Sequence, residues 1–213
     1  MKRTEILPVG PAVSDDSFDD AIEAAVEKVH AGVPVGIPTD TVYVLATDPT
    51  DPGATDRLFS LKHRPRSQDL SLLVASVDQA LEIATSIPEA TRRLMDRFWP
   101  GPLTLVVPRN PAWAVDLGDD ELTIAVRAPD HAVPLALAED VGPLAVTPAG
   151  VQGERVFETA AEVAEQYGKW VPLVLDGGRC AGLPATVVDG TGDEPRLLRE
   201  GRLAWDEIRE VVG

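Results

Sequence analysis

The sequence predicts one α/β domain in which a twisted mixed sheet is flanked by helices. Helical and strand-like segments alternate along all 213 residues, and no repeat, low-complexity tract or linker separates them. Several neighbouring strand segments have no helix between them, which favours antiparallel pairs beside parallel ones. Apolar residues make up 44% of the chain and aromatic residues only 5%, so Val, Leu, Ile and Ala are expected to form the core.

Helices are predicted from apolar spacing and from the residues at their ends. In residues 18–30, Ile22, Val26 and Val29 lie on one side, and Gly32 stops the helix. Caps, capping boxes and composition predict the other helices. These lie from Asp51-Pro52 to Lys62, after Ser76, over 88–98, over 131–139, from Thr159 to Gly168, and from Ala204 onward.

Strands are predicted where short apolar or alternating runs lie between turns. Residues 123–127 alternate, so Thr123, Ala125 and Arg127 share one face, and this arginine faces either solvent or a pocket. Trp99-Pro-Gly-Pro102 breaks the preceding helix and is interpreted as a rigid turn. The other predicted strands cover residues 33–37, 70–75, 103–107, 144–147, 171–175, 185–189 and 196–199.

Charge and composition exclude several classes of function. A net charge of −16 disfavours nucleic-acid binding unless the basic residues gather on one face. Cys180 is the single cysteine and cannot form an internal disulfide, and the three histidines lack metal-ligand spacing. We therefore expect a reduced, cytoplasmic, metal-free fold in which Cys180 is a structural thiol. No signal peptide or transmembrane segment is predicted.

Two polar segments form a candidate phosphate site. Lys62 and Arg64 emerge at the end of a predicted helix, and the threonine-rich turn at residues 38–43 (PTDTVY) interrupts an apolar run. If the two segments meet, fixed positive charges face small hydroxyl groups, an arrangement suited to a phosphate-bearing ligand. Basic residues at a helix end also commonly lie in solvent and offset the helix dipole. The Lys-x-Arg pattern alone therefore does not establish a phosphate site.

Seven segments occur in the order found in the Sua5/YciO/YrdC family, which the chain resembles over residues 18–202. They are PTDTVY at 38–43, KHRP at 62–65, WPGP at 99–102, TIAVR at 123–127, the loop at 144–153, ATVVD at 185–189 and REG at 199–201. The resemblance implies a YrdC-like domain at 18–202 around a deep basic cavity, followed by a C-terminal helix at 203–213.

The resemblance also implies L-threonylcarbamoyladenylate synthase activity. Such nucleotidyltransferases join L-threonine, bicarbonate or CO2, and ATP with Mg2+ into threonylcarbamoyl-AMP, and they release pyrophosphate. The product serves the N6-threonylcarbamoyladenosine modification of tRNA. Two alternatives stay open: a non-catalytic paralogue that binds a nucleotide or phosphorylated ligand, and an RNA-binding module, which the net charge disfavours.

Matching motifs imply a role for each candidate residue. Lys62 and Arg64 are expected to contact the ATP phosphates and to stabilise the charge that builds there during the reaction. The other implied nucleotide-binding residues are Thr123, Thr147, Ala149, Gly150 and Arg199. The implied threonine-binding residues are Thr39, Thr41, Arg127 and Thr186, with the arginine suited to the threonine carboxylate.

The chain departs from the family pattern at four places in the expected cavity. Pro148-Ala-Gly150 stands for Ser-Ala-Asn, Val44 for a glycine, Ala185 for a serine, and Asp69 for a proline. The lost hydroxyl and amide predict weaker nucleotide binding, by about 1.5–3 kcal/mol for each hydrogen bond to a charged ligand. Backbone N–H groups of Ala149 and Gly150 are expected to restore part of it.

Overall fold

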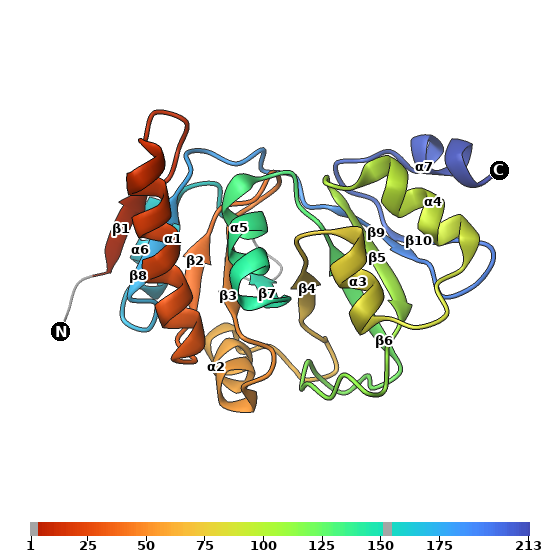
Figure 1. Ribbon diagram of the computed structural model, residues 1–213, viewed down its shortest axis with the longest axis horizontal. Helices are drawn as coiled ribbons and strands as arrows, with labels where there is room; N and C mark the ends of the chain where they lie inside the picture. The colour runs from red at the N-terminus through yellow and green to blue at the C-terminus, as the bar shows by residue number, and fades with distance from the viewer. Residues whose placement is uncertain (1–3, 151–154) are drawn as a thin grey trace.

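The computed structural model describes residues 4–150 and 155–213, which fold into ten strands and seven helices (Figure 1). The strands are β1 (Glu5–Pro8), β2 (Val35–Ile37), β3 (Val44–Thr47), β4 (Ser71–Leu73), β5 (Leu103–Pro108), β6 (Thr123–Arg127), β7 (Leu144–Pro148), β8 (Leu173–Asp176), β9 (Thr186–Asp189) and β10 (Arg196–Arg199). The helices are α1 (Asp15–His30), α2 (Pro52–Lys62), α3 (Val77–Ile83), α4 (Glu89–Phe98), α5 (Ala132–Val141), α6 (Ala160–Tyr167) and α7 (Trp205–Val212).

All ten strands belong to one mixed sheet, as the sequence predicts. Their order is β1-β8-β2-β3-β7-β4-β6-β5-β9-β10. The pairs β1/β8, β2/β8, β4/β6 and β5/β9 are parallel, and the other neighbours are antiparallel. The antiparallel pairs β2/β3 and β3/β7 place the turn before β3 next to the loop after β7.

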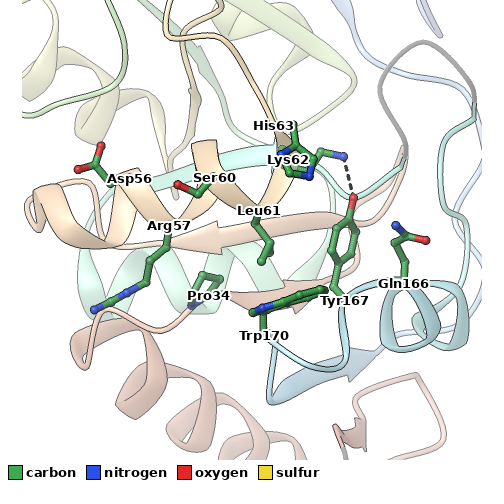
Figure 2. A pocket seen from close by; sticks show the side chains of 10 residues that line it. All are labelled: Pro34, Asp56, Arg57, Ser60, Leu61, Lys62, His63, Gln166, Tyr167 and Trp170. Atoms are coloured by element: carbon green, nitrogen blue, oxygen red, sulfur yellow. Dashed lines mark hydrogen bonds between the residues drawn. The ribbon is translucent and has the colours of Figure 1, made fainter.

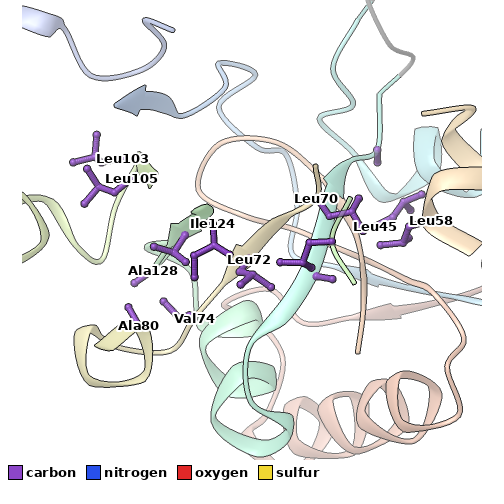
Figure 3. Packing of buried hydrophobic residues seen from close by; sticks show 14 of the residues in the cluster. Leu45, Leu58, Leu70, Leu72, Val74, Ala80, Leu103, Leu105, Ile124 and Ala128 are labelled. Carbon is purple, nitrogen blue, oxygen red and sulfur yellow. The ribbon is translucent and has the colours of Figure 1, made fainter. Parts of the chain in front are cut away.

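The sheet carries a hydrophobic core on each face. One core packs α1 and α5 against the sheet, and the other packs α2, α3, α4, α6 and α7 against the opposite face. Consecutive residues of a strand therefore enter different cores: Leu72 belongs to the second core and Leu73 to the first. Figure 3 follows the second core from Leu58 of α2 through Leu72 to Leu105 of β5.

Local capping fixes where the helices begin. The Ser76 hydroxyl accepts the Gln79 N–H at 3.1 Å, and Thr159 with Glu162 forms a reciprocal capping box. Asp51 caps α2 at the Gly53 N–H, 2.8 Å away. These predicted helix starts are confirmed. Helix α1 begins at Asp15, three residues before the predicted start, because Ser14 is its cap.

Two strands were not expected from the sequence. Edge strand β1 is only four residues long and pairs with β8 on one side. Most of its residues are exposed to solvent, so its sequence shows no clear alternation of apolar and polar residues. Strand β3 follows the polar turn at 38–43 directly, and all four of its residues are buried. None of the helices in the described ranges is long and apolar enough to cross a membrane.

Candidate functional site

Lys62 ends helix α2 and lies against the loop that follows β7. Its Nζ donates to the Tyr167 hydroxyl at 3.0 Å and to the carbonyl oxygen of Gly150, and the Ala149 carbonyl oxygen lies 3.5 Å away. Burial, followed by the nearby charge of Arg64, lowers the pKa of Lys62 to about 8. Three predicted nucleotide-binding residues, Lys62, Ala149 and Gly150, are therefore brought together.

Arg64 lies beyond the helix end and donates to neutral acceptors. His63, in the left-handed conformation with φ 46°, turns the chain after α2. The Arg64 guanidinium then donates from Nε to the Gln68 carbonyl at 2.6 Å and from Nη2 to the Asp69 carbonyl at 2.8 Å. Burial lowers the pKa of Arg64, although the charge of Asp69 opposes that shift. The Asp69 carboxylate is thus near enough for its charge to act on this cation.

Thr123 lies at the start of β6 and belongs to the same part of the site. Its hydroxyl donates to the Asp120 carboxylate, and its N–H donates to Asp120 Oδ1 at 3.1 Å. The Asp120 N–H lies 3.3 Å from Asp69 Oδ1. Contacts therefore connect Arg64, Asp69, Asp120 and Thr123, while the threonine hydroxyl proton is directed to a carboxylate of the chain.

The hydroxyls of Thr39 and Thr41 hold the turn between β2 and β3. Thr39 Oγ donates to the Val42 carbonyl at 2.7 Å and accepts the N–H groups of Thr41 and Val42, both at 3.1 Å. Thr41 Oγ lies 2.9 Å from Thr39 Oγ and accepts Nη1 of Arg127 at 2.8 Å. Three of the predicted threonine-binding residues therefore form one connected group.

Of the two predicted surroundings of Arg127, open solvent is excluded, because this residue is only 6% exposed. Besides Thr41, its guanidinium donates to the Gly101 carbonyl at 2.9 Å and forms an ion pair with Asp40 Oδ1. Asp40 Oδ2 is buried without a hydrogen-bond partner, and Arg202 Nη1 lies 3.9 Å from it. The group thus contains one carboxylate oxygen with unused acceptor capacity.

Thr186 and Arg199 lie on the two C-terminal strands. Thr186 Oγ donates to the Leu203 carbonyl at 2.6 Å and accepts the N–H groups of Gly201 and Leu203 at 2.9 and 3.1 Å. This hydroxyl fixes the loop from which Arg202 donates to the Asp40 carbonyl at 2.5 Å. Arg199, in contrast, is exposed and donates from Nη2 to the carbonyl of Ala185 at 3.0 Å.

Backbone hydrogen bonds join the lysine group to the turn that Arg127 holds. The Ala149 N–H donates to the Tyr43 carbonyl at 2.9 Å, and Tyr43 is two residues beyond Thr41. The Thr147 hydroxyl is buried in β7 without a partner. Lys62 and Arg127 are therefore linked through the backbone around Tyr43 and Ala149, whereas Arg199 donates to Ala185, directly before the neighbouring strand, and is connected to the Arg127 group through the loop at 201–203.

Gly150 occupies a position with no room for a side chain. A Cβ at this residue would overlap the Arg155 carbonyl oxygen and would lie 2.7 Å from the Val156 Cα. Val44, by contrast, lies in extended strand β3 opposite Pro148, so this position does not require a glycine. The glycine at position 150 is thus sterically required in this structure, and the valine at position 44 is accommodated without backbone strain.

Three residues with central contacts were not assigned a role from the sequence. Asp40 lies between two assigned threonines, which was a usable signal. Arg202 follows the Arg-Glu-Gly segment directly, and Tyr167 had no local signal at all. Cys180 is buried, which raises its thiol pKa to about 11, so it stays protonated near neutral pH and fits the structural interpretation.

A family model described as Telomere recombination, Sua5_yciO_yrdC, matches residues 27–201. The chain belongs to the Sua5/YciO/YrdC family. Among its relatives, a Mycobacterium tuberculosis protein named putative threonylcarbamoyl-AMP synthase is 39% identical over 195 residues, which cover 90% of this chain and 89% of that protein. A Pyrococcus abyssi protein named threonylcarbamoyl-AMP synthase is 37% identical over 194 residues, and 57% of it is covered.

Solved structures of the Sua5/YciO/YrdC family superimpose on the chain. Pyrococcus abyssi Sua5, described as complexed with L-threonine, gives a TM-score of 0.87 at 34% identity and covers 99% of this chain. The match accounts for 61% of that Sua5 chain, so the chain corresponds to about three-fifths of it. Escherichia coli YciO gives a TM-score of 0.84 at 25% identity, with 94% of this chain and 97% of YciO covered.

Proposed function

We propose that this chain is a threonylcarbamoyl-AMP synthase. It joins L-threonine, bicarbonate or CO2, and ATP, and it releases pyrophosphate, which makes it a nucleotidyltransferase. Relatives of that name at 37–39% identity and the likeness to threonine-bound Sua5 support this proposal. The product's use in tRNA modification predicts a cytoplasmic location. RNA is not part of the proposal, because a net charge of −16 opposes it.

The observation that carries the proposal is that three predicted nucleotide-binding cations bind uncharged acceptors. Lys62, Arg64 and Arg199 donate to backbone carbonyls, and Lys62 also donates to a tyrosine hydroxyl. Among the described residues, none of these three side chains has a carboxylate within 4 Å. Three cations that form no salt bridge in an acidic protein favour a polyanionic ligand such as ATP, although the charge of Asp69 acts on Arg64 from a longer distance.

At the nucleotide end, Lys62 and Arg64 exchange neutral carbonyls for phosphate oxygens. When the threonylcarbamate oxygen attacks the α-phosphorus, a P–O bond forms, the bond to the leaving pyrophosphate breaks, and negative charge builds on the phosphoryl oxygens. The two cations stabilise that charge. Mg2+ is expected to enter as MgATP, bound mainly to the substrate phosphates and to water.

At the threonine end, Asp40 Oδ2 is the unused acceptor and binds the substrate ammonium. A guanidinium has five N–H donors, and three of those of Arg127 already meet Gly101, Thr41 and Asp40. The remaining donors of Arg127 are left for the threonine carboxylate. Thr39, Thr41 and Thr186 then act by holding the turn and the loop in place rather than by direct contact alone.

The test of the activity is pyrophosphate release. We expect release only when L-threonine, bicarbonate, ATP and Mg2+ are all present, and omission of any one of them is the matched control. Folded protein that releases no pyrophosphate at high enzyme concentration would reject the proposal. Tight ATP binding without turnover would then favour the non-catalytic alternative.

The test of the site is Asp40→Asn. The amide keeps an oxygen for Arg127 but replaces the free carboxylate oxygen with a donor, so we expect KM for threonine to rise about tenfold or more while KM for ATP is unchanged. Asp116→Asn is the control, because Asp116 also pairs with an arginine, Arg66, outside this group. An unchanged KM for threonine in folded Asp40→Asn would refute this role of Asp40.

A further inference from the structure

A pocket with a volume of about 590 Å³ lies between α2 and α6, and we call it the α2–α6 pocket (Figure 2). Its lining includes Pro34 before β2, Leu61 of α2, and Tyr167 and Trp170 at the end of α6 and beyond it. Figure 2 shows the hydrogen bond from Lys62 to the Tyr167 hydroxyl at the edge of this pocket. Lys62 is the one residue of this lining that has been assigned to the nucleotide, and no residue of the lining has been assigned to threonine.

The walls of the α2–α6 pocket suit a flat apolar group. Trp170 is 58% exposed although it is the largest kind of side chain, and it lies next to the ring of Tyr167, the Leu61 side chain and Pro34. Pockets that bind small molecules typically measure about 300–1,000 Å³ and have mainly apolar and aromatic walls with a few polar groups. Stacking on an exposed indole favours a planar ring.

The charges around the α2–α6 pocket favour an anion. Lys62 and Arg57 both line it, whereas the one carboxylate in the lining, Asp56, already pairs with Arg66 at 2.8 Å. Arg57 donates to the Gly32 carbonyl, a neutral acceptor. A net positive lining in a protein of net charge −16 is a local feature, and within a Debye length of about 8 Å it outweighs the distant acidic surface.

We propose that the α2–α6 pocket is a second small-molecule site, which binds a planar aromatic ring that carries one carboxylate. The ring lies against Trp170 and Tyr167, and the carboxylate takes the Lys62 ammonium away from the Gly150 carbonyl. Because Lys62 is then no longer available to phosphate, the ligand weakens ATP binding. This last consequence rests on the proposed function, whereas binding in the pocket does not.

Anthranilate is a suitable probe because it is planar, carries one carboxylate and is fluorescent. We expect its fluorescence anisotropy to rise on titration with the full-length protein, and its neutral analogue 2-aminobenzamide to bind at least tenfold more weakly. Trp170→Ala should weaken anthranilate binding at least tenfold, about the loss of one aromatic stack. Leu122→Ala, which removes a more exposed apolar side chain elsewhere, should leave it unchanged.

The charge contact has its own readout. Because burial lowers the pKa of Lys62 to about 8, anthranilate affinity should fall as the pH rises through 8, and Lys62→Met should abolish both this fall and the preference for anthranilate over its amide. Equal binding by the wild-type protein and Trp170→Ala, or no binding at millimolar anthranilate, would overturn the proposed site. Both outcomes are binding measurements, so they test the pocket independently of whether the protein releases pyrophosphate.

Calorimetric ATP titration separates the two proposals. Saturating anthranilate should weaken ATP binding severalfold in the wild-type protein and in Leu122→Ala, but not in Trp170→Ala. If anthranilate binds in the pocket and ATP affinity does not change, the second site is retained and its coupling to Lys62 is wrong. If ATP does not bind at all, the proposed function fails and the anisotropy titrations still decide the α2–α6 pocket.

Discussion

Gly150→Asn tests whether the departure from the family pattern is a loss of function or a steric requirement. The substitution restores the asparagine that the family usually carries, so sequence reasoning alone predicts tighter ATP binding. A regained hydrogen bond to a charged ligand is worth about 1.5–3 kcal/mol, or about 10- to 150-fold in affinity. The structure predicts the opposite outcome, because backbone atoms of Arg155 and Val156 occupy the space of the new side chain.

The magnitude follows from what has to move. The segment at 155–157 is held to the residue before β3 by the Tyr43 N–H, which donates to the Phe157 carbonyl at 2.9 Å, and it cannot shift without straining that bond. Overpacking typically costs about 1–3 kcal/mol, and one lost backbone hydrogen bond adds about 0.5–1.5 kcal/mol. We therefore expect Gly150→Asn to lower the free energy of unfolding by about 2–4 kcal/mol.

The assay is urea unfolding followed by tryptophan fluorescence, with calorimetric ATP titration of the folded variant. Gly10→Ala is the control, because its new Cβ would meet only Gly177 backbone atoms at 4.0 Å; its free energy of unfolding should change by less than about 1 kcal/mol. A Gly150→Asn protein that is as stable as the wild type and binds ATP tenfold more tightly would refute the steric reasoning.

Three further predictions concern stability and pH. Thr186→Val leaves the N–H groups of Gly201 and Leu203 without their acceptor, so urea unfolding should show a loss of about 1–3 kcal/mol. Thr159→Ala removes the cap of α6 and should cost about 1 kcal/mol in the same assay. Burial lowers the pKa of Lys62 to about 8, so pyrophosphate release should fall as the pH rises through 8. Over the same window the unfolded chain binds more protons than the folded one, so the contribution of this lysine to stability should rise from pH 8 to about 10, a change visible in Tm.

The architecture was largely predictable because its signals are local. The capping patterns at Ser76 and Thr159, each formed by residues three positions apart, identified two helix starts, and the alternation at 123–127 identified β6. Strand β3 was missed because the polar turn before it interrupts the apolar run, while its burial depends on β2 and β7 on either side. Burial between two neighbouring strands does not produce an alternating apolar pattern within four residues, so the sequence of β3 does not identify it.

The candidate site was predictable as a set of segments but not as a set of contacts. Family resemblance grouped residues 38–43, 62–65 and 123–127, but it did not indicate that the Arg127 guanidinium also binds Asp40, Thr41 and Gly101. Which acceptor a side chain meets depends on ångström-scale packing between distant strands. Sequence spacing does not encode that geometry.

The two ends of the site differ in what a ligand must displace. Lys62 and Arg64 hold neutral carbonyl oxygens, so a phosphate replaces weaker acceptors with charged ones, and hydrogen bonds to charged groups are roughly twice as strong as neutral ones. Arg127 already holds a buried carboxylate, and breaking such a pair leaves an uncompensated charge that costs about 3–5 kcal/mol. The exchange is therefore favourable at the lysine end and unfavourable at the Arg127 end. A polyanion is expected to bind first through Lys62 and Arg64, while the Asp40–Arg127 pair stays intact and Asp40 Oδ2, which has no hydrogen-bond partner, is left for a cationic amino group.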